Sequence, residues 1–194
     1  RTEQALRGAI AKIPNGVYRS AVVVDGFDEP VTIQCAVSIN DRDIHVDYAG
    51  TSPQIKRGIN VVMNYTHAYT TYTLMCAIAP NVPNNEGAFR PISVSAPDGS
   101  ILNCRRPVAV GARHIIGHFV SQPLLNALGQ ALPERVIADG SAGLWITMFE
   151  GERTVGYMSV RVKPSAQEIA AADALYRDMR QGRALLIVMM VMLI

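Results

Sequence analysis

The chain has 194 residues, enough for one domain or for a domain with an appendage. Hydrophobic residues make up 49% and charged residues 18%, which excludes a disordered chain. The net charge is +2 and no basic run occurs, so nucleic acid is not an expected partner. Three widely spaced cysteines without a C-x-x-C motif are typical of a reduced, cytoplasmic protein.

The two ends of the chain carry signals of their own. The sequence opens on Arg1 inside a helical pattern and without a methionine, which predicts a processed chain or a piece of a longer protein. At the other end, residues 184–194 are apolar over only 11 residues, whereas a membrane helix needs about 20. We therefore expect no membrane span and interpret this end as a buried or truncated segment.

A helix is predicted at the start of the chain. Leu6, Ile10 and Ile13 recur at spacings of four and three, which places them on one helical face within residues 2–13. Pro14 is expected to end this helix, because a proline lacks the backbone donor that a further turn requires.

Three strands follow, over residues 17–24, 31–39 and 44–48. Each alternates apolar and polar side chains with a period of two, as a strand with one wet face does. Short polar turns join them, so we expect an antiparallel meander. The inward-facing residues predicted for the second and third strands are Val31, Ile33, Cys35, Val37, Ile39, Ile44, Val46 and Tyr48.

A central helix is predicted after a loop at residues 49–60, which has two glycines, a proline and no periodicity. Apolar residues then recur at helical spacing over residues 61–79, and Pro80 closes the pattern. The residues predicted to form its apolar face are Val61, Tyr65, Ala68, Tyr72, Met75 and Ala79.

Residues 80–103 combine prolines, glycines and asparagines around one short apolar run. Residues 83–87 are predicted to reverse the chain, because proline fixes φ and asparagine and glycine tolerate left-handed backbone. Residues 91–97 then form one strand whose pairing ends at a proline on each side. The residues favour a rigid joint between two helical blocks, and the alternative is the floor of a site.

Two further helical segments are predicted. Residues 111–136 are helical with an interior proline, Pro123, and they form either two pieces, the second capped by Ser121, or a single kinked helix. Residues 165–182 begin with a capping box, Ser165 to Glu168, and continue with apolar residues at helical spacing.

Four stretches in this order resemble one known family. They are "DYAGTSPQ", residues 82–87, "FRPISVSAPDGSILN" and "RHIIGHF" with "ALGQALPERVIADG". Together they resemble the hydantoinase B/oxoprolinase family, which comprises the B-type subunits of N-methylhydantoinases and the C-terminal halves of ATP-dependent 5-oxoprolinases, with related subunits in acetone and acetophenone carboxylases. The resemblance covers residues 1–149, and residues 150–194 are interpreted as a diverged or truncated helical segment.

The resemblance implies part of a larger α+β fold. We expect an antiparallel meander packed on the central helix, with additional helices. It also implies an A-type partner that binds ATP and phosphorylates an amide or carbonyl oxygen, in a hetero-oligomer acting on a small cyclic amide. Asp/His/Gly-rich motifs that resemble metal or catalytic sites lie upstream of the matched part in the family. They are absent from this chain, so no cofactor or metal is expected in the chain itself.

His114, His118 and Arg113 are candidate catalytic residues. The two histidines lie four apart on one predicted helical face, which is a metal-ligand spacing, but the sequence offers no third ligand beside them. Bonds to neighbouring loops or to a partner protein are therefore favoured over metal binding. Arg113 could hold a carboxylate or a phosphate, although a structural ion pair is the commoner role of such a residue.

Asn60, Asn84, Asn85 and Arg90 are candidate substrate-binding residues. Asn60 precedes the central helix, where it could hold an anion or cap the helix, and capping is favoured. Asn84, Asn85 and Arg90 match a family motif, although turn formation alone accounts for the asparagines. His45 and Asp47 lie on the wet strand face and are interpreted as solvated, and Tyr65, Tyr69 and Tyr72 as packing residues.

Three functional hypotheses follow. The first is part of a B-type subunit of an ATP-dependent hydantoinase or 5-oxoprolinase. The second is part of a ketone carboxylase, and the third is a module that only scaffolds or binds a partner. The chain carries no phosphate-binding loop and no dinucleotide fingerprint, so ATP is expected to bind the partner.

Overall fold

The computed structural model describes residues 1–136, 144–151 and 154–161. The chain divides into two compact units, Arg1–Ala138 and Asp139–Ile194, and each is described by itself. Among the described residues, no helix is both long and apolar enough to cross a membrane. The apolar run at residues 184–194 and the capping box at residues 165–168 lie outside the described residues.

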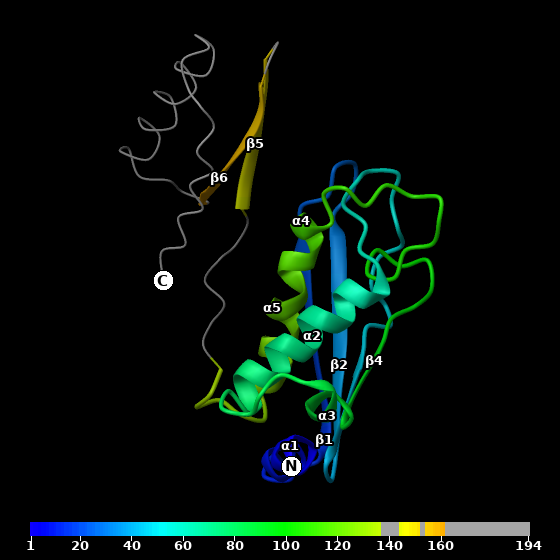
Figure 1. The fold of residues 1–194 in the computed structure, drawn as a ribbon. Coiled ribbons are helices and arrows are strands. Elements are labelled where there is room, and N and C mark those ends of the chain that lie inside the picture. Colours follow the sequence, from blue (N-terminus) through cyan, green and yellow to red (C-terminus); the bar gives the residue numbers. More distant parts are fainter. Residues whose placement is uncertain (137–143, 152–153, 162–194) are drawn as a thin grey trace. The chain divides into compact units, whose positions relative to one another are not determined.

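A four-stranded sheet forms the centre of the first unit (Figure 1). Strands β1 (Gly16–Val24), β2 (Val31–Asn40) and β3 (Asp43–Asp47) form the predicted antiparallel meander. Strand β4 (Ile92–Ser95) follows the central helix in the chain and pairs parallel to β3. The α+β class is therefore confirmed, and the fourth strand makes the sheet mixed.

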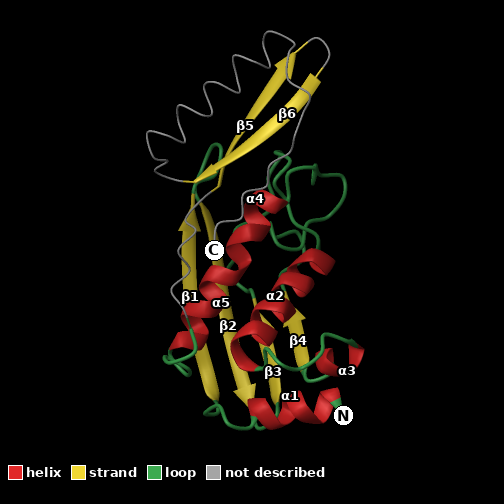
Figure 2. Ribbon diagram, turned by 60° about the vertical axis from the view of Figure 1, so that its left-hand side comes forward, coloured by secondary structure: helices red, strands yellow, loops and turns green. Residues whose placement is uncertain are grey.

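Helices cover one face of this sheet, and no described helix of the first unit lies on the other face (Figure 2). Figure 2 shows α2 and α5 side by side against the strands, with α1 at one end. The helical elements are α1 (Thr2–Ile10), α2 (Met63–Ile78), α3 (Glu86–Phe89), α4 (His114–Gly117), a 3-10 turn (His118–Val120) and α5 (Ser121–Gly129).

The two sheet faces follow the alternation in the sequence. Every residue predicted to point inward from β2 and β3 is buried, with at most 3% of its surface exposed. Strand β4 lies between Pro91 and Pro97, and its bonds to β3 extend from Pro91 to Ser95. The amide of Ile44 donates to the carbonyl of Pro91 at 2.9 Å, and the amide of Tyr48 donates to the carbonyl of Ser95, also at 2.9 Å. The core thus lies between the inner sheet face and the helices.

The predicted apolar face of the central helix is confirmed at Val61, Met75 and Ala79, which are buried, and wrong at Ala68 and Tyr72. Tyr72 is 63% exposed and Ala68 is also exposed, whereas Thr66 and Thr70 are fully buried. Each buried threonine hydroxyl donates to a backbone carbonyl, Thr70 to that of Thr66 at 2.7 Å and Thr66 to that of Leu102 at 2.6 Å. Because these bonds satisfy the hydroxyl groups, the polar residues can turn inward and the tyrosines outward.

The segment from α4 to α5 forms one continuous helical run. The backbone stays in the right-handed helical region through the 3-10 turn and at Ser121, so this segment is a single helix with a tightened middle turn. Ser121 makes no cap hydrogen bond; its Oγ instead lies 2.9 Å from the hydroxyl of Thr73 in α2. Of the two alternatives, the single helix is therefore the one observed.

The second unit contains an antiparallel pair of strands, β5 (Leu144–Gly151) and β6 (Thr154–Arg161). The helical prediction for residues 150–194 is not met over β6. The sequence of β6 places valine, tyrosine and threonine residues close together, and these favour extended backbone. The rest of that predicted helical segment lies outside the described residues.

Candidate functional site

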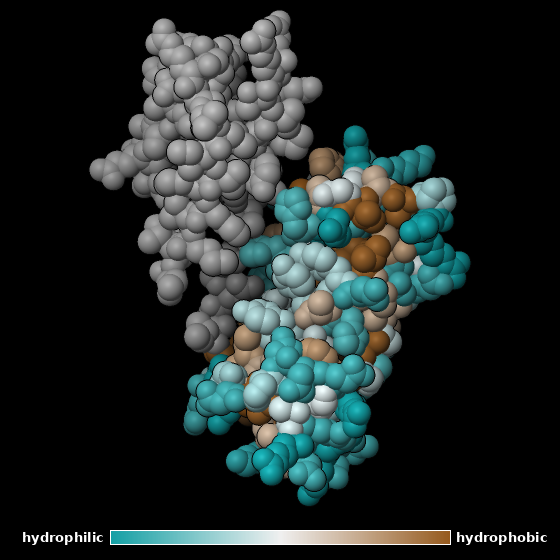
Figure 3. All heavy atoms as spheres, in the orientation of Figure 1, coloured by the Kyte–Doolittle hydropathy of each residue, from teal (hydrophilic) through white to brown (hydrophobic). Residues whose placement is uncertain are grey.

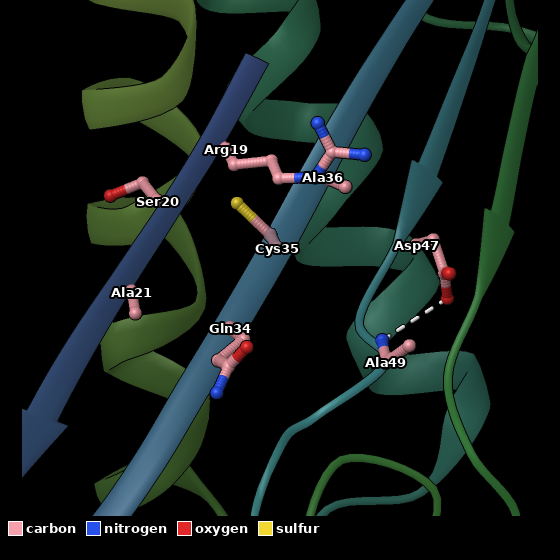
Figure 4. Close-up of a pocket in the computed structure, with 8 residues that line it drawn as sticks. All are labelled: Arg19, Ser20, Ala21, Gln34, Cys35, Ala36, Asp47 and Ala49. Atoms are coloured by element: carbon pink, nitrogen blue, oxygen red, sulfur yellow. Dashed lines mark hydrogen bonds between the residues drawn. The ribbon is translucent and has the colours of Figure 1, made fainter. Parts of the chain in front are cut away.

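The outer face of the sheet carries an open pocket of about 430 Å³ (Figure 4). Figure 4 looks onto this face, with the helices behind the strands. We name it the sheet-face pocket. The residues that line it are Arg19, Ser20, Ala21, Gln34, Cys35, Ala36, Asp47 and Ala49.

The strand register explains why the face is hollow there. Arg19 of β1 pairs with Ala36 of β2, and Ala36 pairs with Asp47 of β3, so the three residues form one row across the sheet. The middle residue of the row is an alanine, and the long side chain of Arg19 crosses β2 beside it (Figure 4). A cation that reaches across β2 and a carboxylate on β3 therefore share this face of the sheet.

Asp47 is held in place by a chain of hydrogen bonds. Its Oδ1 accepts from the amide of Ala49 at 3.1 Å and from the hydroxyl of Ser95 at 3.0 Å. The Ser95 Oγ lies 3.1 Å from Nε2 of His45, whose Nδ1 lies 2.8 Å from Oγ of Ser93. Since Ser95 gives its only proton to Asp47, its Oγ accepts from Nε2 of His45.

The charges at the pocket are not neutralised by each other. Among the ion pairs of the described residues, none includes Arg19 or Asp47. Oδ2 of Asp47 has no hydrogen-bond partner within the part of the chain that the structure describes. The pocket therefore presents a cationic donor and an anionic acceptor to a small molecule.

A second pocket, of about 330 Å³, lies between two loops of the first unit. We name it the two-loop pocket. Figure 3 shows hydrophobic side chains gathered at the end of the unit where these loops lie, whereas the opposite end is mainly hydrophilic. The residues that line this pocket are Gln54, Ile55, Lys56, Pro107, Val108 and Ala109.

Asn60 joins the two walls of the two-loop pocket. Its Oδ1 accepts from the amide of Ile55 at 2.8 Å, and its Nδ2 lies within 3.0 Å of the carbonyls of Ile55, Arg57 and Ala109. The residue is fully buried. The predicted capping role is wrong, because Val62 is the N-cap of α2 and the side-chain amide of Asn60 bonds to the two loops instead.

The other predicted substrate-binding residues lie beside α1. Oδ1 of Asn85 caps α3 through the amide of Ala88 at 3.3 Å and accepts from the hydroxyl of Thr2 at 3.0 Å. Nη1 of Arg90 lies 3.3 Å from a carboxylate oxygen of Glu3. Asn84 is exposed. These contacts join the Pro-Asn-rich segment to the first helix.

The predicted catalytic residues lie at the opposite end of the first unit, in α4 and directly beside it (Figures 1 and 2). Arg113 and His114 are exposed, and Nη1 of Arg113 donates to the carbonyl of Val110 at 3.3 Å. The ring of His118 meets Phe119 edge-on. No group of three His, Cys, Asp or Glu side chains suited to a metal occurs among the described residues. The histidines and the asparagine segment therefore do not form one site.

Sequence reasoning missed the sheet-face pocket. Alternation placed His45 and Asp47 on the wet face, and this placement is confirmed, but they were interpreted as separately solvated. Arg19 lies 28 residues before Asp47 in the chain. The signal that could have joined them is the register of the two hairpins, which follows from turns of known length between strands of known phase.

Comparison with known proteins places this fold in a family. The sequence matches a family model described as hydantoinase B/oxoprolinase over residues 1–173. The resemblance predicted from the motifs is thus confirmed, and the match continues beyond residue 149. The chain is 32% identical, over 170 residues, to a protein named as the B-type subunit of a D-/L-hydantoinase from a Pseudomonas species, covering 80% of this chain and 28% of that protein.

Two solved structures share the fold. An ATP-dependent caprolactamase from Pseudomonas jessenii matches with a TM-score of 0.68 and 24% identity, covering 81% of this chain and 28% of that one. A nucleotide-free acetone carboxylase matches with a TM-score of 0.68 and 17% identity, covering 81% of this chain and 24% of that one. The chain therefore spans about a quarter of the length of these relatives.

Proposed function

Because the chain belongs to the hydantoinase B/oxoprolinase family, we propose that it is part of the B-type subunit of an ATP-dependent enzyme that opens a cyclic amide ring. The observation that carries this proposal is the family match over residues 1–173. The sequence relative named as a hydantoinase component and the shared fold with a caprolactamase support it. This chain spans 28% of each of those proteins.

The proposed reaction begins on the partner. An amide is a poor electrophile, because its nitrogen lone pair is delocalised onto the carbonyl. The A-type subunit transfers the terminal phosphoryl group of ATP to the amide oxygen, which weakens this resonance. Water then attacks the carbon, and the bond between carbon and nitrogen breaks with a proton delivered to the nitrogen, which leaves an acyl phosphate. A second water hydrolyses the acyl phosphate to a carboxylate and inorganic phosphate. The B-type subunit completes these later steps.

The proposal assigns ATP to the A-type subunit, and it assigns a divalent metal to B-type residues that this chain does not contain. The three cysteines are free, which supports a cytoplasmic location for the hetero-oligomer. Within it, this chain supplies the sheet and helix scaffold and part of the substrate pocket.

The test is activity of a reconstituted complex. This chain is expressed together with an A-type protein and the remaining B-type region, and the purified complex is given ATP with 5-oxoproline or with hydantoins. We expect ADP and the ring-opened product to form together, and neither product without ATP. A well-folded complex that turns over none of these substrates would overturn the proposal.

Part of a ketone carboxylase is the second candidate, because the acetone carboxylase matches the fold with the same TM-score as the caprolactamase. The same complex is therefore also given acetone or acetophenone with bicarbonate. ATP consumption that depends on bicarbonate would identify the carboxylase reaction. A complex that assembles with the A-type protein, yet consumes no ATP under either condition, would identify a scaffolding role.

A further inference from the structure

We propose that the sheet-face pocket binds a small cyclic amide that carries a carboxylate. In this assignment, Arg19 binds the carboxylate and Asp47 accepts the N–H of the ring. The inference rests on the proposed function for its class of ligand, and it names the residues that contact that ligand. It is argued from the row of side chains across the sheet and from the hydrogen bonds that fix Asp47.

The spacing of the two charges suits a small ring. Arg19 and Asp47 lie in one row on strands separated by β2, and neighbouring strands are about 4.8 Å apart, so their backbones are separated by roughly 10 Å. Between them stands the methyl group of Ala36, and Ala21 also lines the pocket, further along β1. Because the Arg19 side chain crosses β2 beside Ala36 (Figure 4), its guanidinium group lies closer to Asp47 than the two backbones do, and a small flat ring can bridge the two charged groups.

The two charged residues match the hydrogen-bonding groups of the ligand. A guanidinium group donates two parallel hydrogen bonds to a carboxylate, a geometry that a lysine does not reproduce. An ionised Asp47 is an acceptor only, and the N–H of a cyclic amide is a donor. The pocket volume of about 430 Å³ is within the range of small-molecule sites.

Asp47 presents its second oxygen in a fixed direction. The amide of Ala49 and the hydroxyl of Ser95 both hold Oδ1, which leaves Oδ2 as the acceptor for the ligand. His45 in turn holds Ser95, and Ser93 holds His45. Ser95 and His45 are therefore positioning residues, which act on the ligand through Asp47.

Binding to the 194-residue chain itself is the first test. The chain is titrated with 5-oxoproline and with 2-pyrrolidinone, which has the same ring without the carboxylate, and amide NMR shifts are followed. We expect 5-oxoproline to bind about tenfold more tightly, because a charge-assisted pair is lost in 2-pyrrolidinone. Shifted amides should belong to the residues that line the pocket, including Ala36 and Ala49.

Variants separate the two contacts. Arg19→Gln should weaken 5-oxoproline binding about tenfold and leave 2-pyrrolidinone binding unchanged, since only the first ligand has a carboxylate. Asp47→Asn should weaken both ligands, because an amide NH₂ then faces the ring N–H. Arg42→Gln, an exposed arginine outside the pocket lining, is the matched control and should change neither.

The positioning role of Ser95 is tested by the ligand affinities of two Ser95 variants. Ser95→Ala should weaken both ligands less than Asp47→Asn does, and Ser95→Thr, which keeps the hydroxyl, should restore binding. Equal binding of the two ligands, or an Arg19→Gln variant with unchanged affinity for 5-oxoproline, would overturn the proposal. The comparison of the two ligands on the unaltered chain needs no variant and stands even where one fails to fold.

The outcomes also separate this inference from the proposed function. If the chain binds 5-oxoproline through Arg19 but the reconstituted complex opens no ring, the pocket assignment stands and the proposed function fails. If the complex is active and Arg19→Gln leaves the KM for 5-oxoproline unchanged, the pocket assignment fails and the proposed function stands.

Discussion

The buried amide of Asn60 joins two loops through contacts with Ile55, Arg57 and Ala109. Replacement by alanine leaves an amide and three carbonyls without their partner, so we expect Asn60→Ala to lower the free energy of unfolding by about 2–3 kcal/mol. Urea unfolding measures this loss. Asn84→Ala, at an exposed position, should remain within about 0.5 kcal/mol of the unaltered chain. Equal effects of the two substitutions would contradict the stabilising role of the bonds that Asn60 makes to the two loops.

Cys35 gives the fold a dependence on alkaline pH. Burial raises the pKa of its thiol to about 12, whereas an unfolded thiol has a pKa near 8.5. The native state therefore keeps a proton that the unfolded state has lost. Stability from this group is complete below about pH 8.5 and is lost as the pH rises toward 12, by up to about 1.4 kcal/mol per pH unit.

The measurement for Cys35 is urea unfolding at several pH values between about 8 and 10.5, within the window that the two pKa values define. Cys35→Ala should show a shallower decline of stability with pH than the unaltered chain, even though it starts from a lower value. Cys76→Ala removes an exposed thiol and serves as the control. In this variant the free energy of unfolding should decline with pH as it does in the unaltered chain. A decline of the same slope in Cys35→Ala would assign the alkaline loss to other groups.

Among the contacts between elements, the packing of α4 against α2 depends on Gly117. A Cβ atom at this position would lie 2.1 Å from Cε1 of Tyr65, whose ring stacks on Tyr69 with centroids 4.4 Å apart. We expect Gly117→Ala to push Tyr65 off its neighbour and to destabilise the fold by about 1–3 kcal/mol. The near-ultraviolet circular dichroism of the tyrosine pair should change as well.

The control for Gly117 is another helical glycine. A Cβ at Gly8 in α1 would meet nothing within 4 Å, so Gly8→Ala should stabilise the chain by about 0.5–1 kcal/mol. Shortening Tyr65 to alanine in the Gly117→Ala background should recover part of the loss. Stabilisation by Gly117→Ala alone would show that Tyr65 moves without cost.

The strands of the meander could be predicted because their signal is local. Val31 to Ile39 alternate within one stretch, and a strand needs no other part of the chain to fix which residues face inward. The face of α2 could not be predicted in the same way. Hydropathy scores Thr66 and Thr70 as polar, but their hydroxyls bond to carbonyls that only the folded chain supplies.

The candidate site was predictable only in part, for a related reason. The sequence identifies Asp47 as an outward-facing residue, yet its pairing with Ser95 depends on the parallel strand β4, which arrives after the whole of α2. Asn60 was predicted to cap the central helix or to hold an anion, whereas its side chain bonds to two loops. Its partner Ala109 lies 49 residues away, and no local pattern shows that contact.

At the scale of the whole molecule, the sheet of the first unit is formed by residues from the first half of the chain. All its described strand pairs lie between Gly16 and Ser95, and α5 then packs against β1 and β2. The buried apolar residues described run from Leu6 to Leu128. The elements that make and cover this sheet are thus complete before Ala138, where the first unit ends.

We therefore expect a chain ending at Ala138 to fold cooperatively on its own. Its urea midpoint and the slope of its transition, which scales with the surface exposed on unfolding, should match those of the first transition of the full chain. Because each compact unit makes its contacts mainly within itself, removing residues 139–194 should cost the first unit less than about 1 kcal/mol. A non-cooperative or strongly shifted transition in the shorter chain would show that the first unit depends on the second, and that both enter any complex as one folded body.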